Sequence, residues 1–545
     1  MRRRPELRPT AGRIVCAALT MALMLASGGT AHAEDERQSL EELRNTVINL
    51  LQALVDQGVI SRDKAEQMVK AAKEKSAADA AAVAKSDQGA VRVPYVPQVV
   101  QKQIEKDVEE AVKPEVTADV IKEAKTEKWG IPGALPDWVT HTRISGDVTL
   151  REEDILFSGA NVQNFYLNYY GINQAGGFNK AGINALENVS DDRARFRGRV
   201  RLAFNTDITD SISTGVRIAT GNTSDLVSET QTFDGTAPYQ FGVDELFIRF
   251  DERNARRFPW LTAVVGRFEN PYDTPTNLIF HRDLTFTGFA TTGRLGFGDG
   301  SADQSHLFLT LGAHPIQEVA LSPEDKWLVA AQFGTNLRWG EDQNLLIAGG
   351  FFDYFNVTGR LNPTDGHLYD FTAPQFERQG NTYWNIANST DPTVQLYALA
   401  SKFRLANVNI VYQLPLGRFV FGATADAVRN LGYETAVVSE EYGQYQAPRT
   451  KGYQGELSFG YPTVLTPGAW RFIAGYRYLQ RVAVIDAYTD SDFHFGGTDA
   501  SGYYLIGEVG VAPRVWTRLR YMSSNAIDGP TLSIDTIQID LNTRF

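Results

Sequence analysis

Apolar and polar residues alternate over much of the chain from about residue 141 to residue 545. In residues 193–205, apolar or small side chains at even positions are separated by arginines at odd positions, namely Arg193, Arg195, Arg197, Arg199 and Arg201. A period of two places the two sets on opposite faces of a β-strand. Segments 470–478 and 514–521 repeat the pattern, with polar faces that contain Arg471, Arg477, Arg518 and Arg520. The pattern predicts strands that have one apolar and one polar face.

About seventeen segments show this alternation. They are centred near Ile144, Ala194, Ile212, Leu246, Val265, Phe289, Leu307, Val329, Leu346, Leu399, Val408, Phe421, Leu457, Phe472, Tyr504, Leu519 and Ile539. A single strand of this kind would also fit a soluble sheet with one face on a core. Long polar connections, such as residues 158–190 and 357–393, alternate with short turns, which is typical of a transmembrane barrel. Because bacterial barrels favour even strand numbers, we predict an all-β transmembrane barrel of 16 (or 18) antiparallel strands over residues 141–545.

The cost of charge in lipid decides which face of these strands is outermost. An arginine on the lipid face at the bilayer midplane costs roughly 2 to 4 kcal/mol. We therefore expect the nine arginines to line a polar lumen, where their charge would favour anions. Alternatively, Asp147, Glu456, Asp540 and loop carboxylates pair with these arginines and leave a weakly selective pore. The last strand ends at Phe545, a terminal aromatic typical of the signal read by the barrel-assembly machinery.

The first 33 residues have the pattern of a secretory signal peptide. Five arginines precede an apolar run at residues 14–26, and the sequence Ala31-His32-Ala33 resembles a cleavage site. The run is shorter than the roughly 20 residues that a spanning helix needs, so we expect cleavage before Glu34. The mature chain would then lack cysteine, since Cys16 is the only one, and would have a formal charge of −16 from 48 basic and 64 acidic residues. This acidity argues against nucleic acid as a partner.

Two helices are predicted in residues 34–80, ahead of the strands. The first has an apolar stripe at steps of three and four, formed by Leu40, Leu43, Val47, Leu50 and Leu54. A stripe this narrow needs a partner, which is either the second helix or a copy in another subunit, as in a coiled coil. Residues 81–140 contain prolines and charged segments, and we interpret them as a linker with charged helices.

Motifs for other chemistry are weak. The six histidines that remain after cleavage are scattered, and no Gly-x-Ser-x-Gly motif accompanies them, so we expect no enzyme, no catalytic residue and no cofactor. Asp490, Asp492 and Asp499 do not match the spacing of a Ca²⁺ loop, which favours a solvated acidic loop over a metal site. The segment 281–283, His-Arg-Asp, either enters an inward-folded loop or caps a hairpin.

Several stretches resemble the bacterial putative porin family, whose members are barrels preceded by a short helical segment. They are VDELFIRF from Val243, VGRFENPY from Val265, IFHRDLTFTGFA from Ile279, DKWLVAAQF from Asp325, FERQGNTYW from Phe376 and GYRYLQRVAVIDAYTDSDFHFGGTDASGY from Gly475. Residues 128–150, which contain WGIPGALPDWV, are similar as well. The resemblance covers nearly all of the mature chain and implies a porin-like barrel, but it transfers no substrate and no functional residue.

Together these observations predict a porin of the Gram-negative outer membrane that passes small polar or charged solutes by diffusion, with a leaning toward anions. The N-terminal segment would lie in the periplasm. Expected partners are outer-membrane lipid, the barrel-assembly machinery and small hydrophilic solutes, and the oligomeric state stays open, with a homotrimer as one arrangement. The alternative function is a structural barrel that tethers the envelope, in which the N-terminal helices bind periplasmic partners.

Overall fold

The structure, a computed structural model, describes residue 70 and residues 140–545, except 222–225, 228–229, 234–237, 298–303, 321 and 341–342. The predicted signal peptide, the helices of residues 34–80 and the linker of residues 81–140 lie outside the described residues, apart from Lys70 and Thr140. The chain divides into two units, residues 1–118 and 119–545, and the barrel belongs to the second.

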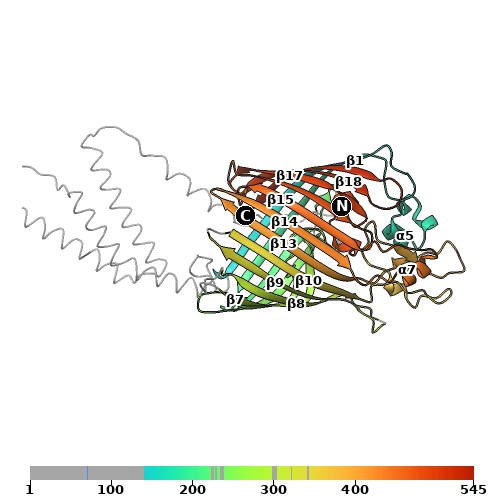
Figure 1. Cartoon of the computed structure of the whole chain (residues 1–545), viewed down its shortest axis with the longest axis horizontal. Coiled ribbons are helices and arrows are strands. Elements are labelled where there is room, and N and C mark those ends of the chain that lie inside the picture. Colours follow the sequence, from blue (N-terminus) through green and yellow to red (C-terminus); the bar gives the residue numbers. More distant parts are fainter. Residues whose placement is uncertain are drawn as a thin grey trace, which may run out of the picture. The chain divides into compact units, whose positions relative to one another are not determined.

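Sixteen antiparallel strands of the described residues form the wall of a barrel (Figure 1). They are β1 (Thr142–Phe157), β2 (Arg193–Asp207), β3 (Ile212–Thr220), β5 (Phe241–Arg253), β6 (Pro259–Glu269), β7 (Thr285–Gly296), β8 (His306–Gln317), β9 (Lys326–Trp339), β10 (Gln343–Phe355), β13 (Arg404–Leu416), β14 (Phe419–Asn430), β15 (Lys451–Gly460), β16 (Trp470–Leu479), β17 (Ala500–Ala512), β18 (Val515–Ala526) and β19 (Ser533–Arg544). Each pairs with the next, and β19 pairs with β1, which closes the sheet. The predicted 16-stranded barrel is confirmed.

One of the seventeen predicted strands is wrong. Leu399 belongs to β12 (Tyr397–Leu399), which pairs only with β11 (Tyr383–Asn385) in a short hairpin within the connection from β10 to β13. Its three residues are too few to cross a bilayer, and Leu399 is buried rather than exposed to lipid. A further two-residue strand, β4 (Gln231–Thr232), extends the ladder on β2 beyond the end of β3.

The helices of the described residues lie in the connections between strands. They are α5 (Tyr169–Ala175), α6 (Phe178–Ala181), η1 (Gly182–Ala185), η2 (Asp370–Thr372), α7 (Thr435–Tyr442), η3 (Asp486–Tyr488) and η4 (Phe493–Phe495). Figure 1 shows α5 and α7 at the same end of the barrel. None of these helices is long and apolar enough to span a membrane.

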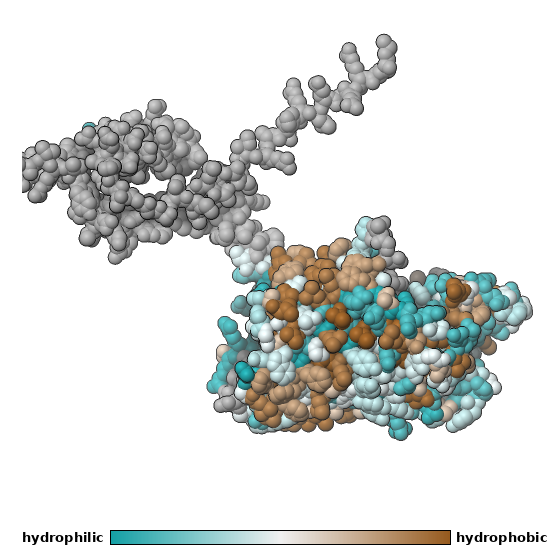
Figure 2. All heavy atoms as spheres, turned by 90° about the horizontal axis from the view of Figure 1, so that it is seen from above, coloured by the Kyte–Doolittle hydropathy of each residue, from teal (hydrophilic) through white to brown (hydrophobic). Residues whose placement is uncertain are grey.

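The alternation along each strand separates an apolar outer face from a polar inner face. On β18, Leu519 is 52% exposed whereas the adjacent Arg520 is 8% exposed. Figure 2 shows hydrophobic residues over much of the outer barrel surface. Because arginine on this face would meet lipid, the register of each strand is strongly fixed.

The interior of the barrel contains an apolar core of its own. Leu278, Ile279 and Phe280, from the connection between β6 and β7, are almost fully buried and pack with Phe352 of β10 and Val484 of the connection between β16 and β17. A wide barrel has no core unless chain enters it, so these two connections fill part of the lumen. They are named the 270–284 loop and the 480–499 loop.

The outer face gives a direct test of the register. We expect Leu519→Arg to destabilise the folded barrel by about 2 to 4 kcal/mol, because the guanidinium would replace an apolar side chain on the lipid-facing surface. Urea-dependent folding into lipid vesicles measures this change, and Leu519→Met, which keeps the surface apolar, serves as the control. Equal stability of the two variants would contradict the assigned register.

Candidate functional site: a constriction inside the barrel

The 270–284 loop is fixed along the inner wall of the barrel. It hydrogen-bonds strand after strand at donor–acceptor distances of 2.7–3.3 Å, through the pairs Tyr272–His314 on β8, Asp273–Gln332 on β9, Asp273–Asn409 on β13, Thr276–Asp426 on β14 and Asn277–Arg477 on β16. These contacts attach the loop to five strands, from β8 to β16, along the inner wall. The loop is therefore positioned by the barrel rather than by its own turns.

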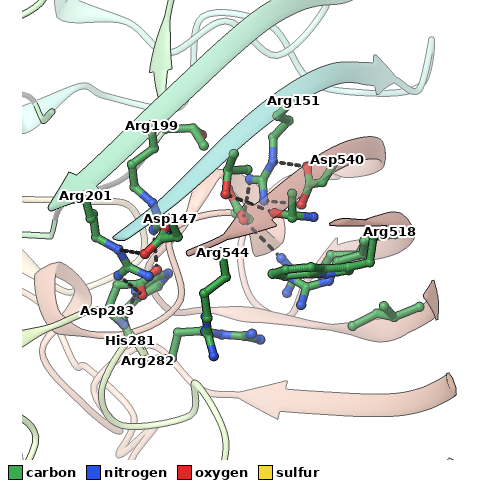
Figure 3. A pocket seen from close by; sticks show the side chains of 18 of the residues that line it. Asp147, Arg151, Arg199, Arg201, His281, Arg282, Asp283, Arg518, Asp540 and Arg544 are labelled. Carbon is green, nitrogen blue, oxygen red and sulfur yellow. Dashed lines mark hydrogen bonds and ion pairs between the residues drawn. The ribbon is translucent and has the colours of Figure 1, made fainter. Parts of the chain in front are cut away.

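The far end of this loop is held by ion pairs with β2. The carboxylate of Asp283 lies 2.8 Å from Arg199 and 2.9 Å from Arg201 (Figure 3). Burial alone would raise the pKa of Asp283, but the two guanidinium groups outweigh it and hold that pKa well below its usual value. Arg201 also binds Asp147 of β1 at 2.8 Å. The His-Arg-Asp segment thus belongs to an inward-folded loop, one of the two predicted alternatives.

The 480–499 loop meets the first loop inside the barrel. The hydroxyl of Thr489 donates to the carbonyl of Asn277 at 2.9 Å, and the amide of His281 donates to the carbonyl of Tyr488 at 2.7 Å. These bonds join residues that are about two hundred positions apart in the sequence. Each loop therefore supports the other within the lumen.

The aspartates of the 480–499 loop are not solvated, so the prediction of a solvated acidic loop is wrong. Asp492 lies 3.0 Å from both Arg151 and Arg520, and Asp490 lies 3.4 Å from Arg477. Burial acts to raise the pKa of Asp490, yet the arginines lower it to about 2. The described residues contain no group of three or more His, Cys, Asp or Glu placed to hold a metal ion.

Between the two loops and strands β1, β2 and β17–β19 lies a cavity of about 250 Å³, the inner cavity (Figure 3). Its described lining contains seven arginines and four aspartates, a net formal charge of +3. They are Arg151, Arg199, Arg201, Arg282, Arg518, Arg520 and Arg544, with Asp147, Asp283, Asp492 and Asp540. The concentration of cationic groups makes this cavity the candidate constriction of the lumen.

The nine predicted pore-lining arginines divide into separate groups. Only Arg199, Arg201, Arg518 and Arg520 line the inner cavity. Arg193 lies beyond it and is exposed, while Arg195 and Arg197 both bind Glu153. Arg471 and Arg518 flank Glu508 at 2.6 Å each, and Arg477 is 1% exposed. Most of these arginines therefore bind a carboxylate, which two arginines share in the case of Glu153 and of Glu508.

The predicted alternative of charge pairing applies to two of its three named acids. Asp147 and Asp540 pair with arginines, at 2.8 Å from Arg201 and 2.7 Å from Arg151. Glu456 instead accepts a hydrogen bond from Tyr504. Strand alternation identified the inward face, but it carries no information on which acid lies opposite each arginine.

Sequence reasoning missed two exposed arginines of the inner cavity, Arg282 and Arg544. Arg282 follows His281 at the tip of the 270–284 loop, where its backbone amide donates to Asn277. No carboxylate of the described residues forms an ion pair with Arg282 or Arg544 within 4.0 Å. The only sequence signal for Arg282 was its place in the segment 281–283.

A model of the putative porin family matches residues 44–545. The chain belongs to this family. The match and the closed barrel identify the protein as an outer-membrane channel. No curated protein sequence matches this porin.

Solved structures similar to this porin include other outer-membrane proteins. OprB of Pseudomonas putida at high pH is 9% identical and covers 76% of this chain and 97% of its own, with a TM-score of 0.41. The outer membrane channel DcaP of Acinetobacter baumannii is 8% identical, with coverage of 74% and 97% and a TM-score of 0.38. OmpF of Salmonella typhi, in a complex with daunomycin, is 10% identical, with coverage of 74% and 97% and a TM-score of 0.37.

Two acids fix the long connection between β10 and β13 of this porin, Glu377 to the connection that follows β1 and Asp486 to the 480–499 loop. Glu377 accepts a hydrogen bond from Asn173 at 2.6 Å, and Asp486 accepts one from the hydroxyl of Tyr383 at 2.8 Å. Burial raises the pKa of Glu377 to about 9, and the neighbouring Asp486 adds to this effect. Burial likewise raises the pKa of Asp486 to about 7. The contact is therefore favoured while these carboxyls carry protons.

This contact predicts a fall in stability as the pH rises. The folded-state pKa of Glu377 lies above its value in the unfolded chain, so the folded state binds more protons and loses stability between about pH 4.5 and pH 9. We expect Glu377→Gln to flatten this dependence, measured by urea unfolding at pH 6 and pH 9. Glu434→Gln, which alters an exposed pair with Lys402, should leave the slope unchanged. Parallel slopes for Glu377→Gln and the wild type would contradict the prediction.

Proposed function

We propose that this porin is a passive diffusion channel for small polar or charged solutes, with a weak preference for anions. The observation that carries the proposal is the presence of Arg282 and Arg544, which form no ion pair with a carboxylate of the described residues, in a cavity lining whose formal charge is +3. Fixed positive charge in a narrow aqueous passage raises the local concentration of anions and lowers that of cations. Because most wall arginines are paired with carboxylates, the preference is weak.

The selectivity rests on few residues. Glu153, Asp147 and Asp283 reduce the field of the ladder on β2, because three carboxylates lie against its five arginines. Arg282 projects from the loop tip as an exposed cation, opposite the wall that contains Arg518. A solute that crosses here meets guanidinium groups, carboxylates, neutral polar side chains and the indole of Trp516. Size and charge at this point decide its rate of passage.

The orientation of the barrel supports a periplasmic N-terminal segment. β1 begins, and β19 ends, at the barrel end opposite to α5 and α7 (Figure 1). Short turns, such as residues 417–418 and 513–514, also join strands at this end, and short turns face the periplasm in bacterial barrels. We assign residues 34–140 to the periplasm on this basis. We further propose that the barrel wall contacts outer-membrane lipid and that the protein assembles as a homotrimer.

The C-terminus supports the proposed assembly signal. Phe545 and Gly146 exchange two backbone hydrogen bonds of 3.0 Å, so the terminal residue helps to close β19 against β1. The side chain of Phe545 is 53% exposed at the same time. An exposed aromatic on the closing strand is available to the barrel-assembly machinery before closure.

Ion selectivity tests the proposed function. We expect Arg282→Gln, which lowers the charge of the inner cavity from +3 to +2, to reduce the anion-to-cation permeability ratio, most strongly at low salt where screening is weak. Reversal potentials in KCl gradients across planar bilayers measure this ratio. Arg193→Gln makes the same charge change outside the inner cavity and should leave the ratio unaltered.

The same recordings separate the proposal from the envelope-tethering alternative. An unchanged reversal potential in Arg282→Gln would contradict the proposed anion preference but would not contradict the proposed channel function. A protein that inserts into bilayers and conducts no ions would instead favour a barrel that serves only as an anchor. Deletion of residues 34–130 then tests whether the N-terminal segment provides the attachment.

A further inference from the structure

A second cavity lies among the connections rather than between the strands. It has a volume of about 620 Å³ and is named the outer cavity. Its lining comes from the connections that follow β1, β10, β14, β16 and β18. The volume lies within the range of pockets that enclose small organic ligands.

The charged groups of the outer cavity are largely paired with one another. Arg481 lies 3.0 Å from Asp499, and Arg449 lies 2.8 Å from Asp528. Burial raises the pKa of the remaining acid, Glu187, against the opposing effects of Gln379 and Arg193. The outer cavity therefore offers little net charge to a ligand, in contrast to the inner cavity.

Aromatic rings and amide groups make up much of the remaining lining. Phe165 is 54% exposed and Tyr442 is 39% exposed, so both rings have faces open to a ligand. Side-chain amides of Gln444 and Gln446 lie in the same lining, next to Gln379, whose amide donates to the carbonyl of Leu167 at 3.1 Å. Ring faces suit an apolar C–H surface, whereas amides donate and accept hydrogen bonds. A ligand that contacts both the ring faces and the amides must have a flat apolar face and a rim of hydroxyl groups. It must also be uncharged.

The two cavities share one short segment of chain. Asp492 lines the inner cavity, whereas His494 and Phe495 line the outer cavity. His494 and Phe495 adopt left-handed backbone conformations, with φ of 56° and 67°, and two glycines with positive φ follow them. Non-glycine residues hold this conformation only where the surroundings impose it. The segment 492–495 therefore lies between the two cavities and contributes side chains to both.

From this arrangement we infer that the outer cavity binds a small uncharged sugar, which it presents to the constriction. The inference rests on the proposed channel function and names a solute class for it. A neutral ring solute gains stacking and hydrogen bonds in the outer cavity and is not repelled by the field of the inner cavity. Captured in this way, it would be concentrated at the entrance to the lumen.

Titration of the full-length protein with maltose tests this inference by two readouts. Maltose should bind the detergent-solubilised protein in calorimetry and should reduce its ion current in planar bilayers. Phe165→Ala and Tyr442→Ala should each weaken binding about tenfold, equivalent to ~1.4 kcal/mol. Tyr442→Phe, which keeps the ring, should bind as the wild type does. Tyr445→Ala is the matched control, because Tyr445 is 74% exposed and does not line the outer cavity.

The outcomes separate this inference from the channel proposal. Ion current without any binding of maltose would overturn the sugar site and leave the channel intact. Maltose binding without ion current would support the site and overturn the channel. Sorbitol, an open-chain polyol without a ring face, should not bind, and equal binding of sorbitol and maltose would overturn the stacking argument.

Discussion

Ion pairs between arginines of the barrel wall and aspartates of the inward loops hold the constriction in place. A loop that leaves the wall and enters the lumen has backbone and side-chain polar groups that need partners, in addition to the apolar core that the two loops form there. Asp283 binds Arg199 and Arg201, which both belong to β2. Asp492 binds Arg151 of β1 and Arg520 of β18. Charge-assisted bonds of this kind are strong and directional. Removal of one partner would leave an unpaired charge away from bulk water, which costs about 3 to 5 kcal/mol at buried sites.

This pairing limits what the arginine ladder can do for transport. A carboxylate that anchors a loop also cancels the field of the guanidinium group that binds it. Glu153 against Arg195 and Arg197 shows the effect on β2. The charge left for solutes comes from arginines that anchor nothing, such as Arg282 and Arg544. Arginines that are paired with carboxylates therefore contribute to stability, whereas Arg282 and Arg544 contribute to the proposed selectivity.

The wall of the barrel could be predicted from the sequence because lipid imposes a local rule. A strand such as β2 must keep its arginines away from hydrocarbon, so the period of two assigns both faces without reference to any distant residue. Leu399 shows the limit of that rule, since a short buried hairpin has the same apolar composition as a membrane strand. The even strand number of bacterial barrels favoured 16 or 18 strands, and 16 is the number formed.

The interior could not be predicted because its contacts join distant parts of the chain. Asp492 binds Arg151, more than three hundred residues away, and no pattern near either residue indicates the other. The acidic run at 490–499 therefore resembled a solvated loop until the barrel brought arginines around it.

The arrangement of the two cavities gives a reason for their different chemistry. A strongly charged entrance would retain counter-ions and slow their release, because passage requires binding that is weak enough to reverse. In the outer cavity both arginines are paired with aspartates, so the neutral solute that we propose for it would bind through ring faces and amides. The net charge is confined to the inner cavity, where an ion passes a few arginines before it reaches open water. Under the proposed function, separation of the two kinds of contact would let one lumen admit neutral and anionic solutes without trapping either.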